Sequence, residues 1–184
     1  STTLPINGNK AMMWYGIAVL AMIIDQLTKI WVVNNMQLYE TLQPIPFLAP
    51  LFQLTRSTNT GAAFGILPMA GNMFLVLAVV IISFMLWYFR DIPARARFVP
   101  VAIGMVIGGA LGNVVDRLQY GHVVDFIHYQ IPNLISNVSN IADHGIVIGV
   151  LLIIADSLWR EYQEKQSAKD DALPELEPDM PDNL

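Results

Sequence analysis

Two aspartates, Asp125 and Asp143, are the residues whose type and setting most strongly suggest chemistry. Asp125 stands in the segment Val-Val-Asp-Phe-Ile, and Asp143 ends the segment Asn-Ile-Ala-Asp just before another apolar run. Two carboxylates that converge share one proton, because both cannot ionise cheaply at short range. The charged member can then take a proton from water while the neutral member polarises a carbonyl. The alternative from spacing alone is that each carboxylate caps a helix or faces water.

The composition indicates a chain that lies in a membrane. Of its 184 residues, 54% are hydrophobic and 14% are charged, and the mean hydropathy is +0.49. A soluble domain usually carries about 25% charged residues. Residues 161–184 contain eight acids and two lysines, so this segment has a net charge of −6. Because the whole chain has a net charge of −5, residues 1–160 have a net charge of +1. No basic surface is available for nucleic acid, which is excluded as a partner.

Four apolar segments are long enough to be bilayer spans, which need roughly 20 residues each. The predicted spans are residues 11–33, 72–89, 98–115 and 145–159, the last of which can begin at Ile141. Between the first two spans, residues 51–55 predict a short strand and suggest a small sheet on the membrane surface. The expected fold class is a mainly α membrane protein with four transmembrane helices and a small extracytoplasmic β-sheet.

The charged residues predict the domain limits and the orientation. Residues 1–166 form the predicted membrane domain, and residues 167–184, acidic and rich in proline, are predicted to be a disordered cytoplasmic tail. Seven lysines and arginines lie in the N-terminus, the second connection and the tail, against Arg56 and Arg117 on the other side. The positive-inside rule therefore puts both termini in the cytoplasm.

Further polar residues lie at helical spacing near the aspartates. Asn113 and Arg117 are four residues apart and share a helix face, where an amide and a guanidinium can bind peptide carbonyls. Alternatively, Asp116 and Arg117 form an ordinary ion pair at the membrane surface. Asp25 and Lys29 are also four apart, and we expect them to neutralise each other within the first span and to brace the site.

Other chemistries find little support in the sequence. The chain has no cysteine, which excludes disulfides and thiolate metal sites. Its histidines, His122, His128 and His144, do not form a His-Glu-x-x-His motif, and no Gly-x-Ser-x-Gly segment is present. We therefore expect no metal and no other cofactor.

Five segments, taken together, resemble the lipoprotein signal peptidases, also called signal peptidase II. The segments are Asp25-Gln26-Leu27-Thr28-Lys29, Asn59-Thr60-Gly61-Ala62-Ala63-Phe64, Gly112-Asn113-Val114-Val115-Asp116-Arg117, Val124-Asp125-Phe126 and Asn140-Ile141-Ala142-Asp143. They occur in family order across roughly residues 11–159. The resemblance implies a four-helix bacterial inner-membrane aspartyl endopeptidase with a small extracytoplasmic sheet. Such enzymes cleave prolipoproteins before a cysteine that carries diacylglyceryl.

The resemblance also assigns roles by motif position. Asp125 and Asp143 would be the catalytic pair. The residues that would hold the substrate or order the site are Asn59, Asn113, Arg117 and Asn140, and those that would support it are Asp25, Lys29 and Asp116. The implied partners are lipid-modified prolipoproteins and membrane lipids, the expected state is a monomer, and the site would lie near the periplasmic face.

Two positions depart from the family pattern. Ser139 stands where an aromatic residue usually precedes Asn-x-Ala-Asp, and His144 follows Asp143 where a small residue is more usual. We expect Ser139 to loosen the wall beside the pair, and a protonated His144 to lower the pKa of an aspartate. Two other functions remain open: a proton-coupled transporter with Asp125 and Asp143 as relay groups, and an inactive relative that binds lipoproteins.

Overall fold

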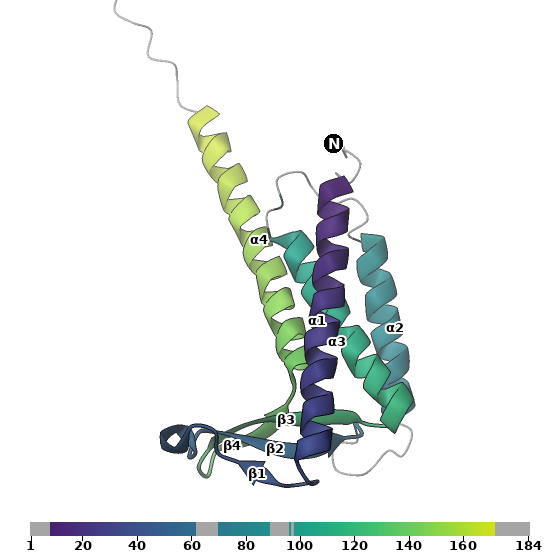
Figure 1. Ribbon diagram of the computed structural model, residues 1–184. Helices are drawn as coiled ribbons and strands as arrows, with labels where there is room; N and C mark the ends of the chain where they lie inside the picture. The colour runs from purple at the N-terminus through teal and green to yellow at the C-terminus, as the bar shows by residue number, and fades with distance from the viewer. Residues whose placement is uncertain (1–7, 62–69, 89–95, 97, 172–184) are drawn as a thin grey trace, which may run out of the picture.

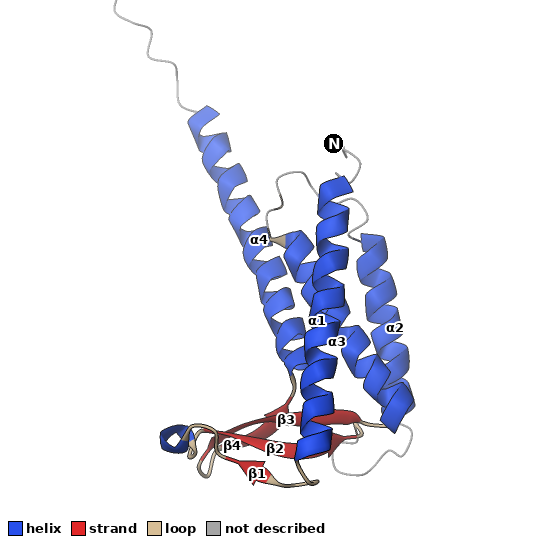
Figure 2. Ribbon diagram, viewed as in Figure 1, coloured by secondary structure: helices blue, strands red, loops and turns tan. Residues whose placement is uncertain are grey.

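The computed structural model describes residues 8–61, 70–88, 96 and 98–171, in which four helices form a bundle and a sheet lies across one end of it (Figure 1). The helices are α1 (Gly8–Asn35), α2 (Ala70–Tyr88), α3 (Val99–Tyr120) and α4 (Ile141–Asp171). The strands are β1 (Thr41–Leu42), β2 (Phe52–Asn59), β3 (Val123–Ile131) and β4 (Ile135–Ser139), and a short 3-10 helix, η1, spans Pro46–Leu48. Figure 2 shows that the strands all gather at the end of the bundle opposite the start of α1.

The helices are apolar enough to lie in a membrane. The stretches Met12–Asn35, Val99–Tyr120 and Ile141–Lys169 meet the length and hydropathy of a bilayer span, and α2 contributes the shorter apolar stretch Leu75–Trp87. Large apolar side chains such as Leu27, Val76 and Leu151 are exposed on the outside of the bundle. Because lipid is as apolar as these side chains, exposure there carries no penalty. The predicted fold class, a mainly α membrane protein with four helices and a small β-sheet, is confirmed, and the extracytoplasmic side of the sheet stays a prediction.

Glycines allow α3 to serve as the central helix against which α1 and α4 pack closely. A Cβ added to Gly108 would collide with the carbonyl oxygen of Ala18 in α1. A Cβ added to Gly109 would lie 2.5 Å from the carbonyl oxygen of Ala142 in α4. Small residues on two sides of α3 therefore let both neighbouring backbones approach it.

The sheet has the antiparallel order β1-β2-β3-β4, and its last two strands connect the third helix to the fourth. Gly121 ends α3 in the left-handed conformation, with φ of 75°, and its N–H donates to the carbonyl of Arg117 at 3.1 Å. The chain then enters β3, where Asp125 pairs with Ser57 of β2. β3 also forms a hairpin with β4, which leads into α4, so Asp125 lies beside the start of that helix.

Three boundaries differ from the sequence predictions. α3 continues to Tyr120, beyond the predicted end of the span at residue 115, so Asp116 and Arg117 lie within its last turns. β2 begins at Phe52, one residue after the predicted start of the strand at 51, and extends past 55 to Asn59. α4 runs without a break to Asp171, so residues 167–171 of the predicted disordered tail are helical. Residues 172–184 lie outside the described part of the chain, and the tail remains a prediction there.

The packing of α4 on α3 gives a prediction about Gly109. Gly109→Ala should destabilise the protein by about 1–3 kcal/mol, because the added methyl group overpacks the contact with the Ala142 carbonyl. Displacement of α4 should also lower the peptidase activity that the family resemblance implies, since Asp143 follows Ala142 directly. Thermal unfolding in detergent and an activity assay measure both effects. The matched control is Gly16→Ala, where an added Cβ meets nothing within 4 Å; equal behaviour of the two variants would contradict the packing argument.

Candidate active site

Asn140 connects the two aspartates that the sequence singles out. Its side-chain Nδ2 donates to Oδ1 of Asp125 at 2.6 Å, and its Oδ1 accepts from the backbone N–H of Asp143 at 2.9 Å. One fully buried side chain therefore touches both residues of the pair. Asp125 and Asp143 also interact with each other electrostatically.

Asp125 is held in a setting that favours its protonated form. Its side chain is 2% exposed, and burial raises the pKa of Asp125 to about 6 from an ordinary value of 3.8. Hydrogen bonds from Asn140 and Asn59 act in the opposite direction, and the nearby charge of Asp143 adds to the increase. A carboxyl group with this pKa can hold or release a proton near neutral pH.

Asp143 lies at the start of α4, where groups of α3 surround it. Its Oδ1 accepts a hydrogen bond from Nδ2 of Asn113 at 2.8 Å. It stands in the first turn of α4, where the helix dipole stabilises negative charge. The guanidinium of Arg117 interacts electrostatically with Asp143, Asp116 and Asp125. The two aspartates thus have the different surroundings that an acid and a base require.

A buried lysine lies behind the pair. Nζ of Lys29 contacts Oδ2 of Asp25 at 2.8 Å, Oδ2 of Asp116 at 2.9 Å and Oδ1 of Asn113 at 2.9 Å. Lys29 is 1% exposed, and both carboxylates are completely buried. Because Lys29 binds the amide oxygen of Asn113, the amide nitrogen is directed to Asp143. The predicted pairing of Asp25 with Lys29 is present, and the ion pair also includes Asp116.

The two buried carboxylates hold the backbone beside each member of the pair. Oδ2 of Asp116 accepts from the N–H of Val124 at 3.0 Å, one residue before Asp125. Oδ1 of Asp25 accepts from the N–H of Ala142 at 2.9 Å, one residue before Asp143. The Lys29 ion pairs therefore determine where both segments sit.

Gln26 is a residue of the site to which the sequence reasoning gave no role. Its Nε2 donates to Oδ1 of Asp116 at 2.9 Å and to the carbonyl of Gly112 at 3.1 Å. It thereby joins α1 to α3 beside the ion pairs. Its place directly after Asp25 in the first motif was the available signal.

The two residues that depart from the family pattern make contacts within the sheet and at the start of α4. Ser139 is buried in the sheet, where its hydroxyl donates to the carbonyl of Ile127 at 3.4 Å. The ring of His144 lies 5.6 Å from that of Tyr129, and its Nδ1 lies 2.6 Å from the carbonyl oxygen of Asn140. The raised pKa of Asp125 has burial, Asn140, Asn59, Asp143 and Lys29 as its causes, and His144 is not among them.

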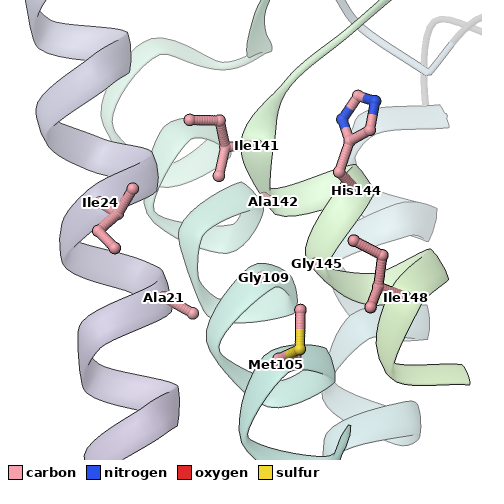
Figure 3. Close-up of a pocket in the computed structure, with 9 residues that line it drawn as sticks. All are labelled: Ala21, Ile24, Met105, Gly109, Ile141, Ala142, His144, Gly145 and Ile148. Carbon is pink, nitrogen blue, oxygen red and sulfur yellow. The ribbon is translucent and has the colours of Figure 1, made fainter. Parts of the chain in front are cut away.

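An apolar cavity of about 220 Å³ lies between α1, α3 and α4 close to this site (Figure 3). From α4 it is lined by Ile141, Ala142, His144, Gly145 and Ile148, most of which form one stripe along the helix. Asp143 lies on the opposite side of α4, since it is two residues from Ile141 and from Gly145. The cavity is therefore a neighbour of the carboxylates and does not contain them.

Comparisons with known proteins agree with this geometry. The profile of the family described as signal peptidase (SPase) II matches residues 17–159. The lipoprotein signal peptidase of Acinetobacter baylyi is 41% identical over 163 residues, which cover 86% of this chain and 88% of that protein. The lipoprotein signal peptidase of Alteromonas mediterranea is 41% identical over 144 residues, covering 76% of this chain and 77% of that one.

Two solved structures, each a bacterial membrane enzyme, share the fold. One has a TM-score of 0.71 at 33% identity and covers 88% of this chain and 93% of its own. The other has a TM-score of 0.69 at 35% identity, with 84% and 95% covered. Fold and sequence together define an aspartic peptidase of the membrane. The chain belongs to the signal peptidase II family, as the motifs predicted.

The buried lysine gives a second prediction. Lys29→Met should destabilise the protein by about 3–5 kcal/mol, because Asp25 and Asp116 are left buried without their cation. Thermal unfolding in detergent measures the loss. Adding Asp25→Asn should recover part of it, since one uncompensated charge is then removed. Lys165→Met, which breaks an exposed pair of the same spacing with Glu161, should leave the melting temperature unchanged; equal melting temperatures for both methionine variants would refute the role of Lys29.

The raised pKa of Asp125 gives a third prediction, about stability and pH. The folded state binds the proton of Asp125 more tightly than the unfolded chain does. Protonation of Asp125 therefore stabilises the folded state fully below pH 3.8, and this contribution is lost as the pH rises through about 6. Asp125→Asn should therefore gain stability over the wild type between pH 4 and pH 7, by about 3 kcal/mol at most. Melting temperatures across this range measure it. Glu164→Gln, at an exposed position, should follow the wild type; a gap that does not widen with pH would contradict the assignment.

Proposed function

We propose that this enzyme removes the signal peptide from lipid-modified prolipoproteins, with Asp125 and Asp143 as its catalytic pair. Family membership and two relatives that are lipoprotein signal peptidases support the activity. The observation that carries the assignment of the pair is the contact of Asn140 with both residues. The substrate class follows the named relatives, and cleavage before the lipidated cysteine follows the family resemblance.

The different surroundings of the two aspartates support different roles in hydrolysis. Asp143, which receives a hydrogen bond from Asn113 and lies at a helix N-terminus, is assigned as the base and accepts a proton from the attacking water. Asp125, whose pKa is raised to about 6, holds a proton and donates it to the scissile carbonyl oxygen. When the tetrahedral intermediate collapses, the C–N bond breaks and the proton on Asp143 passes to the leaving amine. One hydroxyl group of the intermediate returns its proton to Asp125 as the carbonyl of the new carboxyl group forms, so both aspartates regain their starting states.

The four asparagine and arginine residues assigned to the site divide into two groups. The side-chain amides of Asn59, Asn113 and Asn140 are engaged with the aspartates, so we assign them to ordering the pair. Arg117 lies beside the pair and carries directed N–H donors, so we assign it to the carbonyl groups of the substrate.

The arrangement of the helices supports a topology for this multi-pass enzyme of the bacterial membrane. The start of α1 and the end of α4 lie at the same end of the bundle, opposite the sheet (Figure 1). Together with the positive-inside rule, this favours cytoplasmic termini and a sheet on the periplasmic side. Apolar cavities between the helices, such as those at Gly145 and at Met22, offer space for acyl chains. Because every assigned side chain comes from one chain, we propose a monomer.

A transporter remains a weaker candidate. The aspartates of the site gather at one end of the bundle and do not form a path through the middle of the bilayer, as a proton relay would require.

The catalytic pair gives a fourth prediction. Asp125→Asn and Asp143→Asn should each abolish cleavage of a diacylglyceryl-modified prolipoprotein, because either change removes the charged base or the shared proton. A gel-shift assay with purified protein in detergent measures cleavage. Each variant should retain a cooperative thermal transition, and Glu164→Gln serves as an active control.

Two results would count against the proposal in different ways. Full activity of either aspartate variant would remove the pair as the catalytic groups. Lack of cleavage by the folded wild type would instead favour an inactive relative that binds lipoproteins.

A further inference from the structure

The end of the sheet that extends beyond the helices is uncharged and exposes large apolar side chains. It consists of η1 with its flanks and the β3–β4 turn with the adjoining strand ends, residues 44–55 and 128–137, and is called the sheet tip below (Figure 1). Phe47 is 81% exposed and Leu134 is 75% exposed. Residues 41–55 and 127–142 contain no aspartate, glutamate, lysine or arginine. Surfaces that face water usually carry about 25–35% charged residues, so this end is unusual for a solvated one.

The two segments of the sheet tip are fastened together. The backbone N–H of Gln130 donates to the carbonyl of Leu51 at 2.9 Å, and its side-chain amide donates to the carbonyl of Ala49 at 3.1 Å. The rings of Phe52 and Tyr129 lie 5.8 Å apart across the strands. The exposed apolar side chains are therefore presented by one connected unit.

One face of the sheet tip is apolar and is turned towards the helices. Side chains at every second position of a strand point to the same face, so Asp125, Tyr129 and Ile131 share one face of β3. The ring of Tyr129 lies 5.6 Å from that of His144 in α4, which places this face on the side of the membrane helices. Ile135, paired with Ile131, extends the same face, and both are about half exposed.

The opposite face of the sheet tip is polar. His128 stands at its centre and makes hydrogen bonds of 2.9–3.0 Å with the side chains of Gln53, Thr55 and Ser136. The sheet tip is thus amphipathic: its apolar face is directed towards the bilayer and its polar face away from it.

We propose that the sheet tip is an interfacial anchor, inserted with its apolar face into the headgroup region of the bilayer. The surface is continuous with the lipid-facing surface of α4, which begins two residues after β4 and exposes Val147 and Leu151. Exposed aromatic and aliphatic side chains on an uncharged support are what a membrane interface accepts. The partner is the lipid leaflet itself.

The anchor has a consequence for the rest of the sheet. Tyr129 and Asp125 lie on the same strand and face, roughly 13 Å apart at the rise of a β-strand. Seating the sheet tip in the headgroups therefore holds Asp125 at one depth. The inference does not depend on the proposed function, because it concerns only where the sheet lies.

Single nitroxide labels on the full chain, reconstituted into vesicles of phosphatidylethanolamine and phosphatidylglycerol, test the proposal. The chain has no cysteine, so Phe47→Cys, Leu134→Cys and Ile135→Cys each give one labelling site. Ser136→Cys is the matched control, since it adjoins Ile135 but lies on the polar face. We expect labels at 47, 134 and 135 to show a several-fold higher ratio of oxygen to nickel-chelate collisions than the label at 136.

Two outcomes would overturn the anchor. Labels at 47 and 134 with the same nickel accessibility as the label at 136 would place the sheet tip in water. Dipolar broadening between labels at 47, lost on dilution with unlabelled protein, would show that a second copy of the chain covers the sheet tip in place of lipid. Melting temperatures near that of the wild type establish that each labelled variant is folded.

Discussion

The structure depends on the buried ammonium group of Lys29. Lys29 is the partner of both Asp25 and Asp116, and each of these carboxylates in turn holds the backbone immediately before Asp125 or Asp143. A buried charge of this kind contributes little net stability, but its loss is costly because the remaining charges cannot be solvated. Its value here is positional: one ammonium group sets the relative placement of α1, α3, β3 and α4.

The close packing of α1 on α3 makes these ion pairs possible. Oδ2 of Asp25 lies 2.5 Å from the position that a Cβ would take at Gly112, so the carboxylate occupies the space that any other residue would fill. The glycines of α3 thus serve two purposes. Deeper in the bundle they let the backbones of neighbouring helices approach each other, and near the sheet they leave room for the carboxylate of Asp25 between α1 and α3.

The sequence was sufficient for the fold class, because apolar length identifies the helices and a single polar residue stands out against them. Asp125 and Asp143 could be named for the same reason. The partners of Lys29 could not be worked out fully, since Asp116 and Asn113 lie more than 80 residues away and only tertiary packing brings them near. Helix ends were missed where polar residues continue a helix, as at Arg117 and beyond Lys165, because hydropathy records lipid contact and not hydrogen bonding.

Asn140 performs two tasks with one amide group. Its oxygen caps the first turn of α4, and its nitrogen binds Asp125, so initiation of the helix and assembly of the acidic pair are the same event. A serine could cap the turn but offers no second group to reach the carboxyl, and an aspartate would bring a third negative charge. Fraying of this turn would therefore separate the two acids, and under the proposed mechanism cleavage takes place only while the beginning of the last helix is intact.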